Sequence, residues 1–179
     1  MNDLEKLFVS ELRDMYDGEQ QLVEALPEME KSAVSGELKQ AFHEHWEQTR
    51  NHVNRLERVF QSLGEKPSRK TCRGLEGIID EGELISKEFE KNSALDAALI
   101  EAGQKAEHYE ITSYGTLCSW AQELGRAEAL ALLKENLSEE KEADAKLTQI
   151  AESERNVEAT QHDTEKSGEV SSMFKKIVS

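Results

Sequence analysis

The fold is decided by the stretch from Gly64 to Glu90, GEKPSRKTCRGLEGIIDEGELISKEFE. Its first ten residues are typical of a polar loop. The remainder predicts a short helix that is weakened by three glycines, each of which costs up to about 1 kcal/mol relative to alanine. Longer helical patterns lie on both sides. We therefore interpret the stretch as a long connector that carries one short helix.

Apolar residues recur at helical spacing before and after this connector, and they predict two long helices on each side of it. Start and stop signals mark these helices: Asn2 with Glu5, the Ser35-Gly36 break, Gly64, Ser93 with Asp96, and Gly125. The Asn–Glu and Ser–Asp pairs are interpreted as capping boxes, and the glycines at positions 64 and 125 as helix ends.

The lengths of the four helices fix their arrangement. Helices of roughly 27 to 32 residues are about 40 to 48 Å long, and the joints within each pair are very short, so each pair must be antiparallel. The connector is long enough to cross the full length of the bundle. The sequence therefore predicts an all-α fold, a ferritin-like four-helix bundle with a long crossover that contains an extra short helix.

Composition excludes several classes of function. Charged residues make up 33% of the chain and the formal net charge is -15. This charge opposes binding to nucleic acid, because such binding depends on Lys and Arg. We find no signal-peptide pattern and no apolar run near about 18 residues, so we expect a cytoplasmic protein without a transmembrane segment. Cys72 and Cys118 have no zinc-ligand spacing and are predicted to be reduced thiols.

Polar residues interrupt the apolar seam of every long helix. They are Glu19, then His45, Gln48, Thr49 and His52, then Glu107 and Glu110, and finally Glu140 and Asp144. In antiparallel hairpins residue 19 faces residue 48, and residue 110 faces residue 140, so the four groups should meet near the middle of the bundle. We assign His43, Glu44, His108 and Glu139 to the outer faces.

Several buried carboxylates together need a cation, shared protons or internal water. A glutamate-rich site with one or two histidines favours iron or manganese. The ferritin-like di-iron pattern takes one Glu from each of two helices and Glu-x-x-His from each of the other two. This chain has no Glu-x-x-His, and offers instead Gln48-x-x-x-His52, Glu107-x-x-Glu110 and Glu140-x-x-x-Asp144.

Five separated motifs resemble the YciE/YciF family of ferritin-like proteins, over residues 3 to about 152. They are YDGEQQLVEALP (Tyr16–Pro27), HWEQT (His45–Thr49), GLEGIIDEGELI (Gly74–Ile85), DAALIEAGQKAEHYEITSYGTL (Asp96–Leu117) and LSEEKEADAKLT (Leu137–Thr148). The resemblance implies a rubrerythrin-like helical bundle, usually a homodimer, that binds metal, with members tied to stress responses. Many similar members have Glu where this chain has Gln48.

Two hypotheses follow. The first is a protein that binds two Fe or Mn ions and handles Fe(II) or peroxide in a stress response. Its predicted metal-site residues are Glu19, Gln48, His52, Glu107, Glu110, Glu140 and Asp144. The second is a non-catalytic, stress-associated dimer that acts through protein partners. Whether the protein is an enzyme stays open between them. Residues 1–152 should form the bundle, and residues 153–179 a disordered polar tail whose amphipathic end offers a contact for a protein partner.

Overall fold

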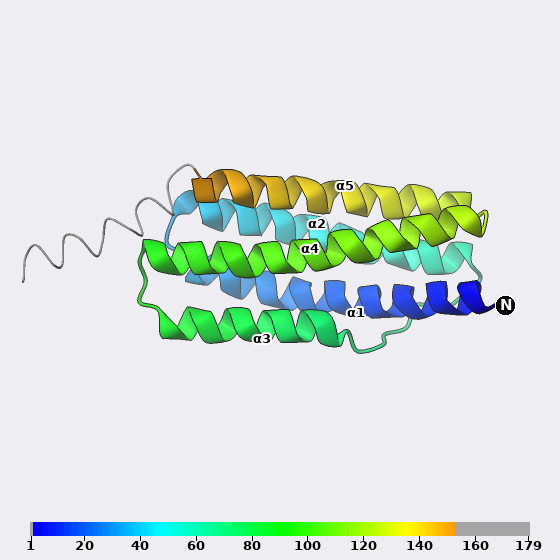
Figure 1. The fold of residues 1–179 in the computed structure, drawn as a ribbon, viewed down its shortest axis with the longest axis horizontal. Coiled ribbons are helices and arrows are strands. Elements are labelled where there is room, and N and C mark those ends of the chain that lie inside the picture. Colours follow the sequence, from blue (N-terminus) through cyan, green and yellow to red (C-terminus); the bar gives the residue numbers. More distant parts are fainter. Residues whose placement is uncertain (1, 153–179) are drawn as a thin grey trace, which may run out of the picture.

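The computed structural model describes residues 2–152, which form five α-helices (Figure 1). They are α1 (Asp3–Ser32), α2 (Gly36–Ser62), α3 (Arg73–Glu88), α4 (Ser93–Glu123) and α5 (Ala127–Ile150). No strand occurs in this part of the chain, so the predicted all-α class is confirmed. The predictions for the tail lie outside the described residues.

The four long helices form two antiparallel hairpins that lie side by side, α1 with α2 and α4 with α5 (Figure 1). The connector leaves the end of α2, runs back along the bundle, and reaches the opposite end through α3, which packs on α1 and α4. This is the predicted long crossover. It allows α2 to pack against α5, so that all four long helices enclose one interior.

The helix ends follow the predicted signals with one exception. The Asn2–Glu5 capping box is present, and Gly64 and Gly125 have the positive φ angles of 72° and 66° that glycine adopts without strain. The predicted box at Ser93 is wrong, because Asn92 caps α4 one residue earlier. Asp96 instead accepts hydrogen bonds from the backbone N–H groups of the α1–α2 turn.

These two bonds tie the start of α4 to the other hairpin. Oδ1 of Asp96 lies 2.6 Å from the backbone nitrogen of Val34, and Oδ2 lies 2.9 Å from that of Ser35. Asp96 is fully buried. A buried carboxylate that satisfies two backbone donors fixes how the two hairpins meet at this end of the bundle.

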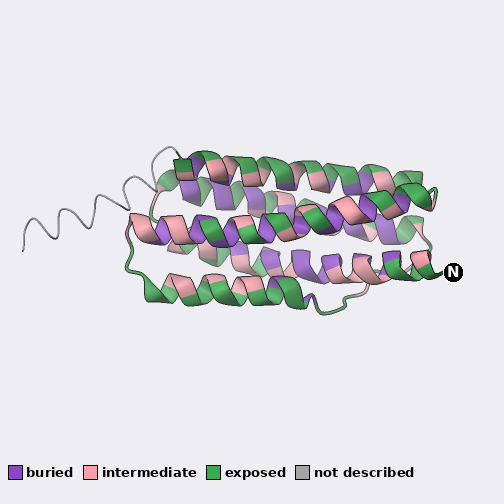
Figure 2. Ribbon diagram, viewed as in Figure 1, coloured by how far each residue is buried: buried purple, intermediate pink, exposed green. Residues whose placement is uncertain are grey.

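The apolar core is divided into two clusters, one towards each end of the bundle. One contains Phe8, Leu12, Leu56, Phe60, Leu117 and Leu133, and the other contains Leu22, Leu38, Phe42, Leu99, Leu147 and Ile150. Figure 2 shows buried residues along the inward faces of the long helices, whereas α3 is mostly exposed or half-buried. Between the two clusters, at mid-height, lie the polar residues that the sequence placed on the seams.

Candidate metal centre

Six polar side chains from four helices converge at mid-height. α1 contributes Glu19, α2 contributes His45 and His52, α4 contributes Glu107 and Glu110, and α5 contributes Glu140. Helical periodicity places each of them on its helix's inward stripe, where an apolar residue would otherwise continue the seam. Four of the six are completely buried, while His45 is 6% and Glu107 is 3% exposed.

The six side chains form two groups that share one carboxylate. His45, Glu107, Glu110 and Glu140 can bring one ligand atom each within 4.8 Å of one another, and so can Glu19, His52 and Glu140. Metal ligands around one ion lie at comparable separations. Glu140 therefore stands between two adjacent positions that could each hold a cation.

The histidines lie against the carboxylates at ion-pair distance. Nε2 of His45 is 3.1 Å from Oε1 of Glu107 and 3.6 Å from Oε2 of Glu140. On the other side of Glu140, Nδ1 of His52 is 2.8 Å from its Oε1, and 3.4 Å from Oε1 of Glu19. Each imidazole thus presents one ring nitrogen to the carboxylates of its own group.

Most of the carboxylate oxygens in the cluster have no hydrogen-bond donor. Among buried atoms, Oε2 of Glu19, Oε2 of Glu107 and both oxygens of Glu110 and Glu140 accept no aligned hydrogen bond. An unsatisfied buried polar group costs roughly 1–3 kcal/mol, and an unpaired charge costs more. Glu110 is the extreme case, because Glu140 at least faces the two histidines at ion-pair distance, whereas no such contact is seen for Glu110 among the described residues.

The electrostatics of the metal-free cluster reflect this crowding. Burial, together with the neighbouring carboxylates, raises the pKa of Glu107 and Glu110 well above the ordinary value. Burial also raises the pKa of Glu19, although His52 opposes it. Burial acts in the same sense on Glu140, but the charge of His52 outweighs it and lowers the pKa of Glu140.

The pKa values of the two histidines shift in opposite directions. Burial disfavours the imidazolium of both, and the pKa of His45 is lowered. The pKa of His52 is nevertheless raised well above the ordinary value, because Glu19 and Glu140 face it. In the absence of metal, the facing carboxylates therefore favour the charged form of His52, whereas burial favours the neutral form of His45.

Polar residues behind the cluster hold His52 and Glu19 in place. Nε2 of His52 contacts Oε2 of Glu139 at 2.7 Å, and Arg55 binds the same carboxylate through two contacts of 2.7 Å. These contacts lower the pKa of Glu139 to about 2, against the opposing effect of burial. The prediction that Glu139 lies on an outer face is therefore wrong, because its long side chain turns inward to His52.

A second chain of hydrogen bonds orients Glu19. Tyr114 donates its hydroxyl proton to Oε1 of Glu19, and Nδ2 of Asn136 donates to the Tyr114 hydroxyl at 2.9 Å. Asn136 in turn accepts from Arg55 at 3.0 Å. Supporting shells of this kind are typical of metal centres, because they fix the orientation of the ligands.

Comparison with known proteins places the chain in a family. The sequence family described as "Domain of unknown function (DUF892)" matches residues 3–160. The chain belongs to this family. It is 44% identical to Protein YciF of Escherichia coli K12 over 152 residues, which cover 84% of this chain and 92% of that protein.

Solved structures agree with this assignment. The crystal structure of the E. coli stress protein YciF aligns with a TM-score of 0.81 at 44% identity, over 84% of this chain and 96% of that one. YcfI from Rhodopseudomonas palustris aligns with a TM-score of 0.80 at 41% identity, over 82% and 94%. A protein from Xanthomonas campestris at 19% identity has the same fold, with a TM-score of 0.70 over 90% and 99%. The YciF resemblance and the predicted fold class are thus confirmed.

The predicted site residues separate into two sets in this DUF892 chain. Glu19, His52, Glu107, Glu110 and Glu140 lie in the cluster. Asp144 lies apart from it, half-buried, with its carboxylate accepting from Gln104 at 3.1 Å and facing His108 at 3.3 Å. Gln48 lies beside the cluster: its Oε1 is 3.4 Å from Nδ1 of His45, and it lines the same cavity as His45 and Glu107.

His45 is the cluster member that our predicted ligand list omitted. Its position on the seam of α2 was visible in the sequence, and it lies seven residues, or about two turns, before His52. When Nδ1–H of His45 donates a hydrogen bond to Oε1 of Gln48, Nε2 carries no proton, and its lone pair faces the carboxylates. This tautomer is the one that can ligate a cation.

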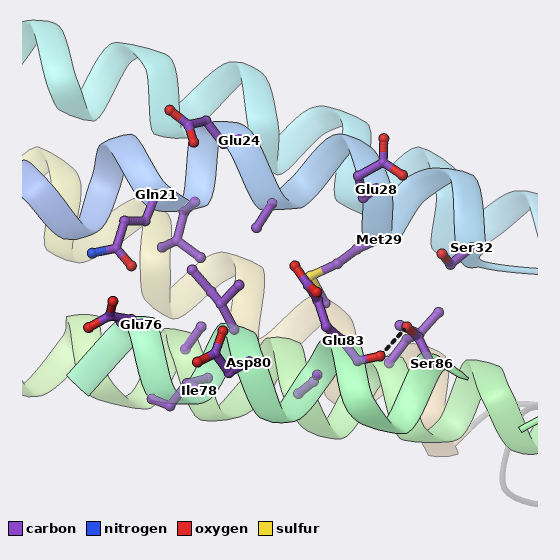
Figure 3. A pocket seen from close by; sticks show the side chains of 17 residues that line it. Gln21, Glu24, Glu28, Met29, Ser32, Glu76, Ile78, Asp80, Glu83 and Ser86 are labelled. Atoms are coloured by element: carbon purple, nitrogen blue, oxygen red, sulfur yellow. Dashed lines mark hydrogen bonds between the residues drawn. The ribbon is translucent and has the colours of Figure 1, made fainter. Parts of the chain in front are cut away.

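One of the cavities in the described part of the bundle reaches the cluster. A cavity of about 210 Å³ between α2 and α5 is lined by His45, Gln48 and Glu107. Another, of about 270 Å³, lies between α1, α3 and α4 and has an apolar floor with acidic residues such as Glu24, Glu76 and Asp80 around it (Figure 3). None of the six cluster residues lines the second cavity.

The residues of the cluster fit a pair of divalent cations. Two histidines and four glutamates are the same ligand inventory as the ferritin-like di-iron pattern, although here both histidines come from α2. Four carboxylates balance two divalent charges, and the donor set of oxygen with imidazole suits Fe and Mn. The carboxylate oxygens without hydrogen-bond donors are the atoms that such ions would satisfy.

Proposed function

We propose that this protein binds two iron or manganese ions in the buried cluster and uses them to oxidise Fe(II) or to remove peroxide. The observation that carries the proposal is the shared carboxylate: two groups of buried ligands meet at Glu140, and their oxygens lack donors. Four buried carboxylates without a cation would lower the free energy of unfolding of the bundle.

In this proposal, His45, Glu107 and Glu110 would hold one ion, Glu19 and His52 would hold the other, and Glu140 belongs to both groups of ligands. Bound iron or manganese would supply electron exchange with dioxygen or peroxide. The surrounding residues bind and orient: Tyr114 donates to Glu19, and Glu139 holds Nε2 of His52 so that Nδ1 faces inward. The apolar clusters above and below close the cluster off from solvent along the bundle axis.

Metal analysis of protein purified without chelator tests the proposal. We expect close to two Fe or Mn ions per chain, or the same stoichiometry after anaerobic Fe(II) loading. A ligand at 100 times its Kd stabilises the folded state by about 2.7 kcal/mol. Chelation should therefore lower the melting temperature by roughly 5–10 °C, since about 2–4 °C corresponds to 1 kcal/mol at this chain length.

Two variants sharpen this experiment. Glu140→Gln removes the shared ligand and should abolish binding at both positions, whereas Glu128→Gln, an exposed residue of the same helix, should bind as the wild type does. Trace metal in the loaded wild-type protein would contradict the proposal. A Glu140→Gln variant that still binds two ions would show that Glu140 is not shared.

A metal-free, non-catalytic bundle is the second candidate, and the ion pairs of His52 with Glu139 and Glu140 favour it. On this alternative, protonated His52 replaces a cation, and the protein acts as a stress-associated dimer through protein partners. It predicts that chelators leave the melting temperature unchanged. YciF of E. coli is described as a stress protein. A role of this chain in a stress response is part of both proposals.

A further inference from the structure

The six residues of the cluster are unequally shielded from solvent. Glu19, His52, Glu110 and Glu140 have no exposed surface, whereas His45 and Glu107 keep a small exposed fraction. On the His52 side, the Arg55–Glu139 ion pair covers the ring, and Tyr114 and Asn136 behind it are completely buried. An ion or small molecule from solvent therefore meets the cluster at His45 and Glu107.

The cavity of about 210 Å³ between α2 and α5 lies on that side. His45, Gln48 and Glu107 line it, and so do Ala143, Leu147 and Phe42 on its walls. Its remaining lining includes Glu44, Glu142 and Lys146, all of which have exposed or half-buried side chains. The cavity thus leads from charged surface residues to two of the cluster's ligands.

Charge at the outer end of the cavity suits a cation. Lys146 is paired with Glu44 at 2.5 Å, so its charge is offset within the mouth. Glu142 adds a second carboxylate there, which accepts a hydrogen bond from the Ser138 hydroxyl at 3.4 Å. Acidic clefts with low-dielectric walls raise the local concentration of cations and accelerate their entry.

We propose that this cavity is the entry route through which hydrated divalent cations reach the cluster, with His45 and Glu107 as the first ligands they meet. This inference rests on the proposed metal-binding function. On this proposal, the Gln at position 48 is not a metal ligand that the chain has lost. Its neutral amide orients His45 and lines the passage. A glutamate at position 48 would add a charge that could retain the ion in the passage.

Stopped-flow uptake of Co²⁺, followed by its visible absorption, tests the route. Ala143→Leu fills the cavity wall, and Ala145→Leu, an exposed residue on the same helix, is the matched control. The leucine at position 143 should slow uptake by about tenfold, because its larger side chain occupies space in the cavity that a hydrated cation would have to cross. Release to excess chelator should slow by the same factor, so that the Kd stays unchanged, and Ala145→Leu should match the wild type.

Glu142→Lys provides a second test that does not depend on packing. Charge reversal at the mouth should slow Co²⁺ uptake at low ionic strength, and the difference should shrink in salt, since screening acts within about 8–10 Å at physiological salt. Glu123→Lys, exposed at the end of α4, is the control.

The outcomes separate the route from the function beneath it. Wild-type protein that takes up no Co²⁺ overturns the proposed metal binding itself. Wild-type uptake with an unchanged rate in Ala143→Leu overturns the route alone. Slower uptake in that variant with an unchanged release rate also overturns the route, because a weakened Kd places the effect on the ligands.

Discussion

Replacing Glu110 by methionine should make the metal-free protein more stable while removing its stabilisation by metal. Glu110 is completely buried, and neither of its carboxylate oxygens has a hydrogen-bond donor. Methionine has a similar length and no group that needs a partner. The substitution therefore removes an unsatisfied polar group without leaving a large cavity.

The magnitude follows from the cost of that group. Leaving a buried polar group unpaired costs about 1–3 kcal/mol, so the variant should gain roughly this much free energy of unfolding. In a chain of this length, this gain raises the melting temperature by roughly 2–12 °C. Urea denaturation in EDTA should show a higher midpoint with an unchanged m-value.

The gain should also depend on pH. Because burial and neighbouring carboxylates raise the pKa of Glu110 above its value in the unfolded chain, the wild-type protein loses stability as pH rises through the folded-state pKa. The methionine variant lacks this loss. The difference between the two proteins in EDTA should therefore grow from pH 5 to pH 8.

Metal should stabilise the wild type more than the variant. Fe(II) or Mn(II) added anaerobically should raise the melting temperature of the wild type more than that of Glu110→Met. Glu101→Met, at an exposed position of the same helix, should change stability by less than about 0.5 kcal/mol and keep the response to metal. If Glu110→Met destabilises the EDTA-treated protein by more than about 1 kcal/mol, the reasoning is refuted.

Three further predictions concern parts of the molecule outside the cluster. Asp96→Asn should lower the free energy of unfolding by about 1–3 kcal/mol in urea melts, because one of the two backbone N–H groups that Asp96 binds would then face an NH₂ group. Burial opposes the charge of Asp17, but donors from the backbone of Cys72 and from Arg69 lower its pKa. The contribution of Asp17 to the free energy of unfolding is therefore present above the pKa of the unfolded state and lost as pH falls through the pKa of the folded state. Asp17→Asn should lose less free energy of unfolding than the wild type between pH 6 and pH 3. Burial raises the pKa of Cys72 to about 11 and also raises the pKa of Cys118. Both thiols should therefore react with a thiol reagent at pH 8 only after denaturation. Fast reaction of the native protein would contradict the burial of the two cysteines.

Sequence reasoning predicted the axial level of the cluster better than the direction of its side chains. Counting residues from each turn placed Glu19, Glu107, Glu110 and Glu140 at one height, which the structure bears out. It separated Glu139 from Glu140 too sharply, because neighbours on a helix differ by about 100° and a glutamate side chain spans much of that difference. Both residues contact His52, from opposite sides of its ring.

The same limit applies to α2 and to the start of α4. Gln48 and His45 are almost one turn apart, and only packing against α4 and α5 decides which of them faces Glu107. At the start of α4, Asn92 and Ser93 are both good caps, and the sequence alone does not show that Asp96 has partners in another hairpin. Tertiary contacts decide both cases.

The division of the apolar core has a consequence for local opening of the metal-free protein. Regions with few apolar contacts open more readily than the core around them, and amide hydrogen exchange measures this opening. The four long helices should therefore show slow exchange in two bands, near Leu12 and Leu56 and near Leu38 and Leu99, with faster exchange at the level of Glu110 between them. A pair of bound cations would join the two bands into one protected region, and the bundle would then open as a single unit.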